Sequence, residues 1–529
     1  MKSFLTLSLT VFIISSAFGQ NWEQLQKVVP SDRTASIRFS KSVDINGTHA
    51  IVGAHRVATD AAGMNELPKA GAAYIFEKNT DGLWSETAKL VASDRNAEDN
   101  FGTSVAIYGE YAIVGAYKRD ETINGVFLRQ CGAAYIFKKN GTGQWEEVQK
   151  LLAADPDSLD YFGVSVDIFG DYALVGASYK ASGSFPQAGA VYVFEKQPDG
   201  HWVEVQKLLA SDKNAFDLFG WSVSLHGNQA LIGAYNQDRN QFGAELKNNA
   251  GAAYIFEKNS SGQWEQIQKI VANDRSEGDF FGFDVSMEEN TLVVGAYQSK
   301  TDASGAVPIN NAGAAYIFEK NNSGVWEQVK KVTATERNEE DLFGYSVAVS
   351  GNNVLVGAYL EDDDGDEQNT MNGSGSAFLF SNENGEWVLN RKLVAADRSP
   401  GDWFGFALAL DGAEAIIGAF ADRDDENSQN PLPEAGSAYF FHNDDQLDHT
   451  HQRAGFSIRV FPNPFSSNIS IEDVPRGAVV HIMDEQGRIL KEVGADGSDL
   501  LVDAADFSPG CYFVWVSTSG GSVVQTVIK

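Results

Sequence analysis

A pattern of apolar segments recurs along the chain with a period near sixty residues. One column of the pattern consists of tryptophans at spacings of 62, 61, 57, 62, 62 and 61 residues: Trp22, Trp84, Trp145, Trp202, Trp264, Trp326 and Trp387. A second column has the same register, and each member except the first precedes a glycine: Phe39, Phe101, Phe162, Phe219, Phe281, Phe343 and Phe404. Such a period with strand-like content is typical of a solenoid or propeller, whose units bury their faces against their neighbours. Both columns predict seven units.

The hydrophobic pattern within one unit predicts four strands. In the second unit, residues 102–108 alternate, residues 111–117 carry no charge, and residues 132–137 are largely apolar. Residues 145–151 mix charged and apolar side chains, so polarity rises toward the last strand. An uncharged strand is expected where both faces are covered, and a mixed one where a face meets solvent. This gradient predicts an all-β fold, a seven-bladed β-propeller over residues 20–442 with the first strand of each unit innermost.

The two ends of the repeat array predict how the ring closes. The array begins with an outer-strand segment at Trp22 and ends with only three strands, at residues 404–410, 415–420 and 437–441. We expect the first segment to be the fourth strand of the seventh blade. Such closure removes the open edge that a linear array would expose.

Segments outside the array predict export and a second domain. Residues 1–19 combine Lys2, an apolar run and small residues, which is the pattern of a signal peptide cleaved after Gly19. The alternative is an uncleaved anchor, but the run is shorter than the roughly 20 residues that a spanning helix needs. No other segment predicts a transmembrane span. A polar linker, residues 443–456, precedes residues 457–529, whose alternating strands and Gly or Pro turns predict a small β-sandwich.

Composition narrows the classes of partner. Forty basic and 72 acidic residues give a formal charge of -32, which repels nucleic acid and anionic lipid and favours a soluble, extracellular monomer. Cys131 and Cys511 are the only cysteines, so we expect no disulfide framework. Cys131 stands in a column otherwise held by alanine or serine, which predicts a small core residue.

The repeated motif resembles a known family. Phe-Gly, then Val-Gly-Ala, then Gly-x-x-Tyr-x-Phe is similar to the FG-GAP repeat that builds the propeller of integrin α-subunits and of many bacterial surface proteins. Many members carry a calcium loop between the first two motifs. Here that connection is a short turn, and only Asp44, Asn46 and Gly47 retain a trace of the loop. Calcium needs about six to eight oxygen ligands, so these turns predict plain hairpins instead.

The tail resembles a second family. Ile458-Arg-Val-Phe-Pro-Asn-Pro-Phe465, Met483-Asp-Glu-Gln-Gly-Arg488 and Ser508-Pro-Gly-Cys-Tyr-Phe513 are similar to the type A C-terminal sorting domain of the type IX secretion system of Bacteroidota. The resemblance implies interaction with that machinery and passage through the outer membrane, usually with removal of the domain. It places the product outside the cell or on the outer-membrane surface.

Residues that recur from repeat to repeat are interpreted as structural parts of the scaffold. The tryptophans favour packing between blades over a carbohydrate-stacking set, since each holds the same strand position. An aspartate two residues before the phenylalanine recurs six times, which favours a turn or capping hydrogen bond over a site: Asp99, Asp160, Asp217, Asp279, Asp341 and Asp402. His449 and His451 lack further ligands with zinc spacing, so a metal site there is the weaker alternative.

No catalytic motif is found in the chain. Gly-x-Ser-x-Gly, a Gly-rich phosphate loop and His-Glu-x-x-His are all absent, and we predict no enzyme. A carbohydrate-active enzyme built from scattered propeller loops stays an alternative. The two longer connections of every blade lie on one side, and variable loops on a rigid scaffold commonly carry function. We therefore predict a binding or adhesion module that recognises a protein or a glycan through this face, with a structural envelope or matrix component as the runner-up.

Acidic loops in the sixth and seventh units offer one candidate site. Residues 361–367 and 422–426 are rich in Asp and Glu. A solvated acidic surface that aids solubility is one interpretation, and recognition of a basic partner is another. The sharper hypothesis is a calcium site at Asp362, Asp364 and Asp366, because a hard dication would relieve the repulsion among these carboxylates. No other cofactor is predicted.

Overall fold

The computed structural model describes residues 22–443, except 307, 367 and 368, and residues 459–528 with gaps at 462–467, 473, 475, 485–488, 496–499, 506, 508–510 and 519–520. The predicted signal peptide (1–19), His449, His451 and the linker beyond Asn443 lie outside the described residues. The chain divides into two compact units, Met1–His442 and Asn443–Lys529. Each is described by itself.

The first unit consists of seven four-stranded antiparallel sheets, and no helix occurs in its described part. Blade 1 contains β2 (Val43–Asn46), β3 (His49–Ala54), β4 (Ala72–Lys78) and β5 (Trp84–Leu90), and blade 2 contains β6 (Val105–Tyr108), β7 (Tyr111–Ala116), β10 (Ala133–Lys139) and β11 (Trp145–Leu151). Blade 3 contains β12 (Val166–Phe169), β13 (Tyr172–Ala177), β14 (Ala190–Lys196) and β15 (Trp202–Leu208), and blade 4 contains β16 (Val223–His226), β17 (Gln229–Ala234), β18 (Ala252–Lys258) and β19 (Trp264–Ile270). Blades 5 to 7 contain β20 (Val285–Glu288), β21 (Thr291–Ala296), β22 (Ala314–Lys320) and β23 (Trp326–Val332); β24 (Ser346–Ser350), β25 (Asn353–Ala358), β26 (Ser376–Glu383) and β27 (Glu386–Leu393); β28 (Phe404–Asp411), β29 (Glu414–Ala419), β30 (Ser437–Asn443) and β1 (Trp22–Val28).

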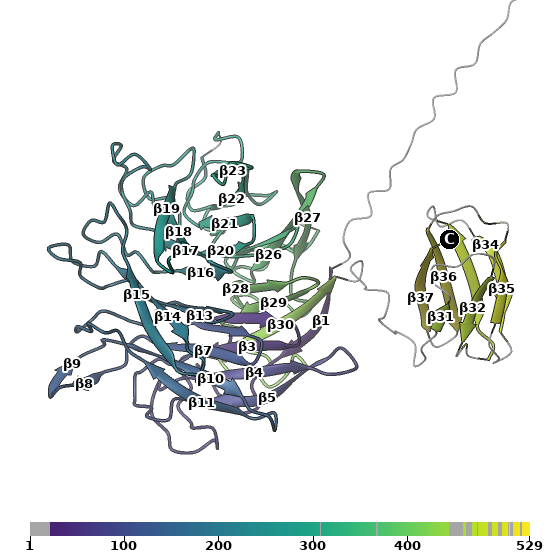
Figure 1. Cartoon of the computed structure of the whole chain (residues 1–529), viewed down its shortest axis with the longest axis horizontal. Coiled ribbons are helices and arrows are strands. Elements are labelled where there is room, and N and C mark those ends of the chain that lie inside the picture. The colour runs from purple at the N-terminus through teal and green to yellow at the C-terminus, as the bar shows by residue number, and fades with distance from the viewer. Residues whose placement is uncertain are drawn as a thin grey trace, which may run out of the picture. The chain divides into compact units, whose positions relative to one another are not determined.

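The seven sheets follow one another around a common centre (Figure 1), and the innermost strands of successive sheets lie side by side, with β28 of the last blade next to β2 of the first. The predicted seven-bladed propeller is therefore confirmed. Its closure is also as predicted, because β1 pairs with β30 and completes blade 7. The backbone N–H of Phe39 donates to the carbonyl of Ala435 (2.9 Å), the same bond that Phe101 makes with Ala70 between blades 1 and 2.

The Phe-Gly motif joins each blade to the preceding one. Phe101 is fully buried, with its ring centroid 5.5 Å from that of Tyr135 and 6.0 Å from that of Phe137. Burial of such a side chain contributes roughly 1.5 to 3 kcal/mol. Gly102 has φ of +86°, and a Cβ there would lie 2.2 Å from the carbonyl oxygen of Ala72. Glycine is required because the backbones of two blades meet at this point.

The outer-strand tryptophans pack against the neighbouring blade. Ring centroids are 4.4 Å apart for Trp84 and Phe440, and 5.7 Å apart for Trp264 and Tyr172. The Gln206 side chain also bonds to both the N–H and the carbonyl of Trp264 across the blade boundary. These contacts support the packing interpretation over a carbohydrate-stacking set.

The hairpin turns and Cys131 agree with the sequence-based expectations. Asn46 pairs with His49 across a two-residue turn in which Gly47 has φ of +57°. Cys131 is buried, and burial raises the pKa of its thiol to about 11. It is a core residue, as its column predicted.

The second unit has two sheets with a shared apolar core. The strands are β31 (Arg459–Phe461), β32 (Asn468–Glu472), β33 (Val479–Asp484), β34 (Ile489–Gly494), β35 (Leu500–Asp503), β36 (Cys511–Thr518) and β37 (Gly521–Ile528). Their order is β31-β32-β35 in one sheet and β34-β33-β36-β37 in the other. Ile471, Ile482 and Val514 are fully buried in this core, so the unit is a small β-sandwich.

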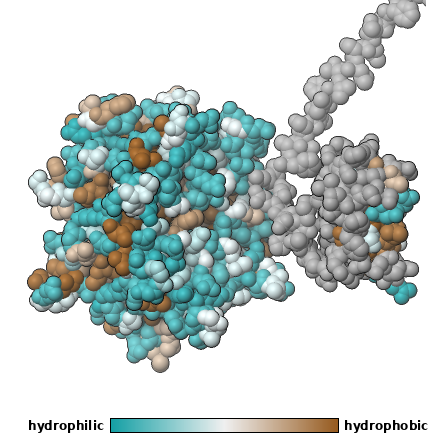
Figure 2. All heavy atoms as spheres, viewed as in Figure 1, coloured by the Kyte–Doolittle hydropathy of each residue, from teal (hydrophilic) through white to brown (hydrophobic). Residues whose placement is uncertain are grey.

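In Figure 2 the face of the propeller turned to the viewer is largely hydrophilic, with hydrophobic residues scattered over it. The hairpin of β8 (Glu121–Ile123) and β9 (Val126–Leu128) projects from blade 2 (Figure 1) and exposes Val126 and Phe127. No helix within the described residues is long and apolar enough to cross a membrane.

Candidate functional site

A cavity of about 650 Å³ lies on the propeller axis. Its wall contains residues of the innermost strand, or of the turn just before it, from every one of the seven blades. The residues just before these strands, such as Trp221 and Phe283, and the residues that follow the second strand, such as Tyr117, mark one end of the cavity. The long connections of the blades start and finish at that end. This end of the cavity therefore lies on the long-loop face, and we call it the axial mouth.

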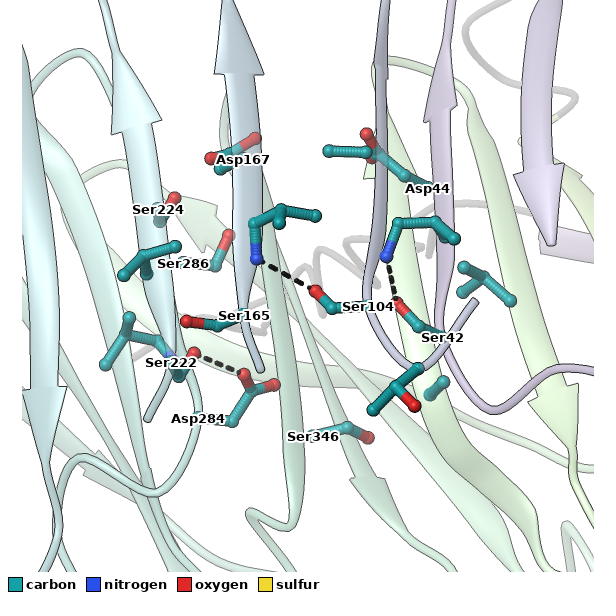
Figure 3. A pocket seen from close by; sticks show the side chains of 18 of the residues that line it. Ser42, Asp44, Ser104, Ser165, Asp167, Ser222, Ser224, Asp284, Ser286 and Ser346 are labelled. Carbon is teal, nitrogen blue, oxygen red and sulfur yellow. Dashed lines mark hydrogen bonds between the residues drawn. The ribbon is translucent and has the colours of Figure 1, made fainter. Parts of the chain in front are cut away.

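Below the mouth, serine and aspartate side chains form a collar that connects the blades. Each innermost strand has a free edge toward the axis, and the preceding blade supplies acceptors for its N–H groups: Ser42 Oγ for Val105 (3.1 Å), Ser104 Oγ for Val166 (3.0 Å), and Ser222 Oγ for Val285 (3.2 Å). Asp284 Oδ2 accepts from the N–H of Val347 (2.8 Å), and its other oxygen accepts from Ser222 (2.9 Å). Figure 3 shows these side chains around the cavity. The collar satisfies strand edges that would otherwise lie unpaired.

Three carboxyl groups of this collar have raised pKa values. Asp44 bonds to the N–H of Ile107, and Asp167 makes the equivalent bond to Leu225. Burial, with a contribution from the Asp167 carboxylate, raises the pKa of Asp44 to about 8. Burial raises the pKa of Asp167 to about 7 and that of Asp284 to about 6. The collar therefore carries less negative charge near neutral pH than its residue types suggest.

Aromatic side chains surround most of the axial mouth. They come from two positions, the residue two after the repeat phenylalanine, at or just before the innermost strand, and the residue after the second strand, together with a residue just before the Phe-Gly motif of blade 7. The members in blades 4 to 7 are Trp221, Tyr235, Phe283, Tyr297, Tyr345, Tyr359, Trp403, Phe406 and Phe420. Consecutive rings contact one another, with centroids 5.8 Å apart for Trp221 and Phe283, 4.9 Å for Phe283 and Tyr345, and 5.0 Å for Tyr345 and Phe406. We call this set the aromatic arc.

Blades 1 and 2 place four cations where the arc ends. Lys41, which lines the cavity, holds its ammonium 4.8 Å from the centroid of the Phe406 ring. Arg38 lies 5.0 Å from the Phe420 ring, and Lys118 lies 5.3 Å from the Tyr117 ring. Arg56 is the fourth member. We call these residues the cationic sector.

The cationic sector changes the protonation of its own members and of a buried histidine. The ring of His55 stacks on that of Phe420. Burial, followed by the charges of Lys41, Arg56, Arg38 and Lys118, lowers the pKa of His55 to about 2. Burial and the Arg38 charge lower the pKa of Lys41 to about 8, although Asp284 opposes this shift. All four cations are therefore close enough to influence one imidazole.

Away from the axis, a different polar cluster recurs. In blade 4, Asp212 accepts from the hydroxyl of Tyr254 (2.8 Å) and from the ammonium of Lys269 (2.6 Å). The same Tyr–Asp–Lys cluster recurs in five other blades, formed by Tyr74, Asp32 and Lys89; Tyr135, Asp94 and Lys150; Tyr192, Asp155 and Lys207; Tyr316, Asp274 and Lys331; and Tyr439, Asp397 and Lys27. Blade 6 has Phe378 at the tyrosine position, and there Lys392 pairs with Glu361. Because these clusters recur from blade to blade, we interpret them as structural parts of the propeller scaffold.

The aspartate before each Phe-Gly motif belongs to the scaffold too. Asp217 Oδ2 accepts from the N–H of Asn214 (2.5 Å) three residues earlier, and all six aspartates of the column make this bond. Burial raises the pKa of Asp217, Asp341 and Asp402 to about 7 in each case. The predicted turn hydrogen bond is confirmed.

Arginines fix the long loops that surround the mouth. The guanidinium of Arg95 donates to the carbonyls of Ala58 and Asn65, and that of Arg398 donates to the carbonyls of Asp362 and Asn369. Each arginine directly follows the acidic residue of the Tyr–Asp–Lys position, as Arg95 follows Asp94. The long-loop face is therefore anchored to the scaffold.

The structure divides the predicted acidic surface. Glu361 and Asp422 are buried, paired with Lys392 (2.7 Å) and Lys27 (2.8 Å), and so do not belong to a solvated face. Asp362 Oδ1 accepts from the N–H of Gly373 (2.6 Å). Asp364 accepts from the N–H of Asp366 (3.1 Å) and from the Asn369 amide.

The predicted calcium ligands therefore take part in turns of their own loop. Asn240 and Asp302 make the same turn in blades 4 and 5. The described residues contain no group of three or more His, Cys, Asp or Glu side chains placed to hold a metal ion, and Glu367 lies outside them. The calcium hypothesis stays a prediction.

Sequence reasoning did not identify the axial mouth. Its signal is the residue that follows each Val-Gly-Ala or equivalent motif, which varies while its neighbours repeat: His55, Tyr117, Ser178, Tyr235, Tyr297, Tyr359 and Phe420. A second signal is the residue two after each Phe of the repeat: Lys41, Thr103, Val164, Trp221, Phe283, Tyr345 and Phe406. Two variable columns inside a repeated pattern would have indicated a shared surface.

The matches to known protein families agree with this architecture. The FG-GAP repeat is matched seven times, at residues 22–76, 84–137, 145–194, 202–256, 264–318, 326–380 and 387–441. The secretion system C-terminal sorting domain is matched at residues 459–529, which shows that the chain is exported to the extracellular space or the outer-membrane surface through the type IX machinery. No curated protein matches the chain. A crystal structure of a protein from Lactobacillus plantarum is similar at 10% identity and a TM-score of 0.43, covering 86% of this chain and 99% of the other.

Proposed function

This chain belongs to the FG-GAP repeat family, and from that premise we propose that it is an extracellular binding or adhesion module that recognises a protein or a glycan at the axial mouth of its propeller. The observation that carries the proposal is the aromatic arc at the long-loop end of the axial cavity, where most of its rings are half-buried while Phe406 and Phe420 are buried. Binding sites are typically concave and lined by aromatic side chains with a few polar groups.

Packing alone does not account for the aromatic arc. At the position of Trp221, blades 2 and 3 have Thr103 and Val164, and at the position of Tyr235 blade 3 has Ser178. The blades with these smaller residues form the same four strands. Aromatic residues are thus not needed to build a blade, and they supply large contact area at low entropic cost when a ligand binds.

The test uses a substitution that the repeat itself tolerates. Trp221→Val copies Val164, and Phe242→Ser changes a largely exposed aromatic residue in a long loop of the same blade. The purified protein and both variants are applied to a glycan array and used to capture cell-surface proteins. We expect saturable binding by the parent and by Phe242→Ser, and a loss of roughly tenfold or more in Trp221→Val.

Three results would decide otherwise. Absence of any saturable ligand would favour a structural envelope or matrix component. Loss of binding in Phe242→Ser but not in Trp221→Val would move the site to the peripheral loops. Release of a shortened product from a bound glycan would identify an enzyme, whereas we propose binding without catalysis.

A further inference from the structure

We propose that the ligand of the axial mouth is an acidic saccharide, whose carboxylate binds the cationic sector while its sugar rings lie on the aromatic arc. This inference rests on the proposed function and adds the chemical class of the ligand. The chain has 72 acidic and 40 basic residues, yet four cations converge at the mouth with few carboxylates to balance them.

The cations of the mouth are poorly neutralised. Within the described residues, Arg38 and Arg56 share the half-exposed Glu434, at 2.9 and 3.8 Å. Among those residues no carboxylate forms an ion pair with Lys41 or Lys118, and both ammonium groups lie over aromatic rings. By contrast, each lysine of the Tyr–Asp–Lys clusters has a carboxylate within 3 Å. Asp284 influences Lys41 without forming an ion pair with it. A cation in a partly desolvated cavity that has no carboxylate in direct contact favours binding of an anion.

Two further features favour a saccharide over an acidic peptide. Aromatic faces from several blades surround the anion site, and flat apolar faces of sugar rings pack well on such surfaces. Deeper in the cavity, the collar offers hydroxyl and carboxyl groups that accept or donate hydrogen bonds, including Ser42, Ser104 and Asp44. A sugar presents hydroxyl groups around its whole ring, whereas an acidic side chain presents only its carboxylate. The mouth therefore fits a uronate.

The experiment measures the binding of three probes to the purified protein by titration calorimetry. The first probe is an oligogalacturonate, the second is the same oligosaccharide with its carboxyl groups reduced to alcohols, and the third is polyglutamate. We expect the oligogalacturonate to bind at least about tenfold more tightly than either of the others, since a charge-assisted hydrogen bond exceeds a neutral one by roughly that factor. Its affinity should fall with added salt.

Two lysine variants that copy residues of other repeats test the contribution of the cationic sector. Lys41→Thr copies Thr103 and Lys118→Gln copies Gln298, so both keep side chains that the fold accepts at those positions. Each should weaken oligogalacturonate binding about tenfold and leave binding of the reduced oligosaccharide unchanged. Lys300→Gln, at an exposed lysine of a blade 5 loop, is the matched control and should change neither.

The outcomes separate this inference from the proposed function. Equal binding of both saccharides, with no effect of the lysine variants, would overturn the anionic ligand and leave the mouth as a binding site. Polyglutamate binding as tight as that of oligogalacturonate would overturn the saccharide. If no probe binds, the inference is wrong, and the array and capture experiment with Trp221→Val judges the proposed function independently.

Discussion

The Tyr–Asp–Lys clusters and the axial mouth are built from the same repeat but treat charge in opposite ways. In the clusters, each lysine meets a carboxylate, as Lys269 meets Asp212 at 2.6 Å, and the arrangement recurs from blade to blade. At the mouth, the equivalent positions differ among blades, and Lys41 faces aromatic rings. Where a column is repeated and its charges are paired, it serves the fold. Where it varies and leaves charge uncompensated, it is available for a ligand.

The largest expected effect comes from deleting β1, the strand that completes blade 7 and carries the lysine of its Tyr–Asp–Lys cluster. Deletion of residues 22–28 removes β1, and with it Lys27, the lysine of the blade 7 cluster, and the fourth strand of that blade. The loss of several buried contacts and a whole strand ladder should lower Tm by more than about 10 °C. Calorimetric melting measures this. Truncation after residue 443 removes no propeller strand and is the control; an unchanged Tm in the β1 deletion would contradict the closure.

A single lysine change compares the two regions directly. Lys269→Met leaves the partly buried Asp212 carboxylate without its ammonium and should destabilise the propeller by about 3 kcal/mol. Lys41→Thr removes a cation that burial already disfavours. The free energy of unfolding of this variant should therefore equal that of the parent protein or exceed it slightly. Urea unfolding of the two variants provides the measurement. Equal losses in both would erase the distinction between scaffold and mouth.

A substitution in the collar, between these two regions, should change the stability of the propeller less, and the change should depend on pH. Burial raises the pKa of Asp167 to about 7, so the folded state binds a proton more strongly than the unfolded chain. This contribution to stability is complete at low pH and is lost as pH rises through about 7. Asp167→Ser copies Ser224, which makes the equivalent backbone bond to Met287 without a charge.

We therefore expect Asp167→Ser to exceed the parent in stability by about 1 kcal/mol at pH 8, with a flatter decline between about pH 4 and pH 7. Urea unfolding at several pH values tests it. Asp44 and Asp284 retain part of the slope, because burial also raises the pKa of both groups. A slope identical to that of the parent would show that the Asp167 carboxyl does not titrate in this range.

The smallest expected effect concerns the acidic loop of blade 6. The calcium hypothesis predicts a saturable heat on calcium titration, lost in Asp364→Asn. Asn240 makes the same turn in blade 4, so this substitution should keep the loop and remove only the charge. Weak calcium binding stabilises by less than about 1 kcal/mol at ligand concentrations near Kd. No heat in the parent, or the same isotherm in the variant, would leave Asp362, Asp364 and Asp366 as turn residues.

Much of the fold could be predicted because its determinants are local and repeated. The Phe-Gly and tryptophan columns recur at nearly constant spacing, and the backbone geometry that requires a glycine at Gly102 recurs with a glycine in six of the seven repeats. The ring closure followed from counting strands. The polar clusters were missed because Asp212 and Lys269 are 57 residues apart, and pairing at that separation is not visible in a single repeat.

By itself the sequence determined the number of blades, their strand order, the closing strand and the route of export, since each depends on motifs that a stretch of chain carries alone. Only the tertiary structure decided which charges are neutralised. Glu361 and Asp422 belong to an acidic run in the sequence but lie buried against lysines, whereas Lys41 and Lys118 belong to different repeats and meet at one opening. Electrostatic environment depends on distance and burial, and closing the ring brings together at its axis residues that the chain separates by whole blades.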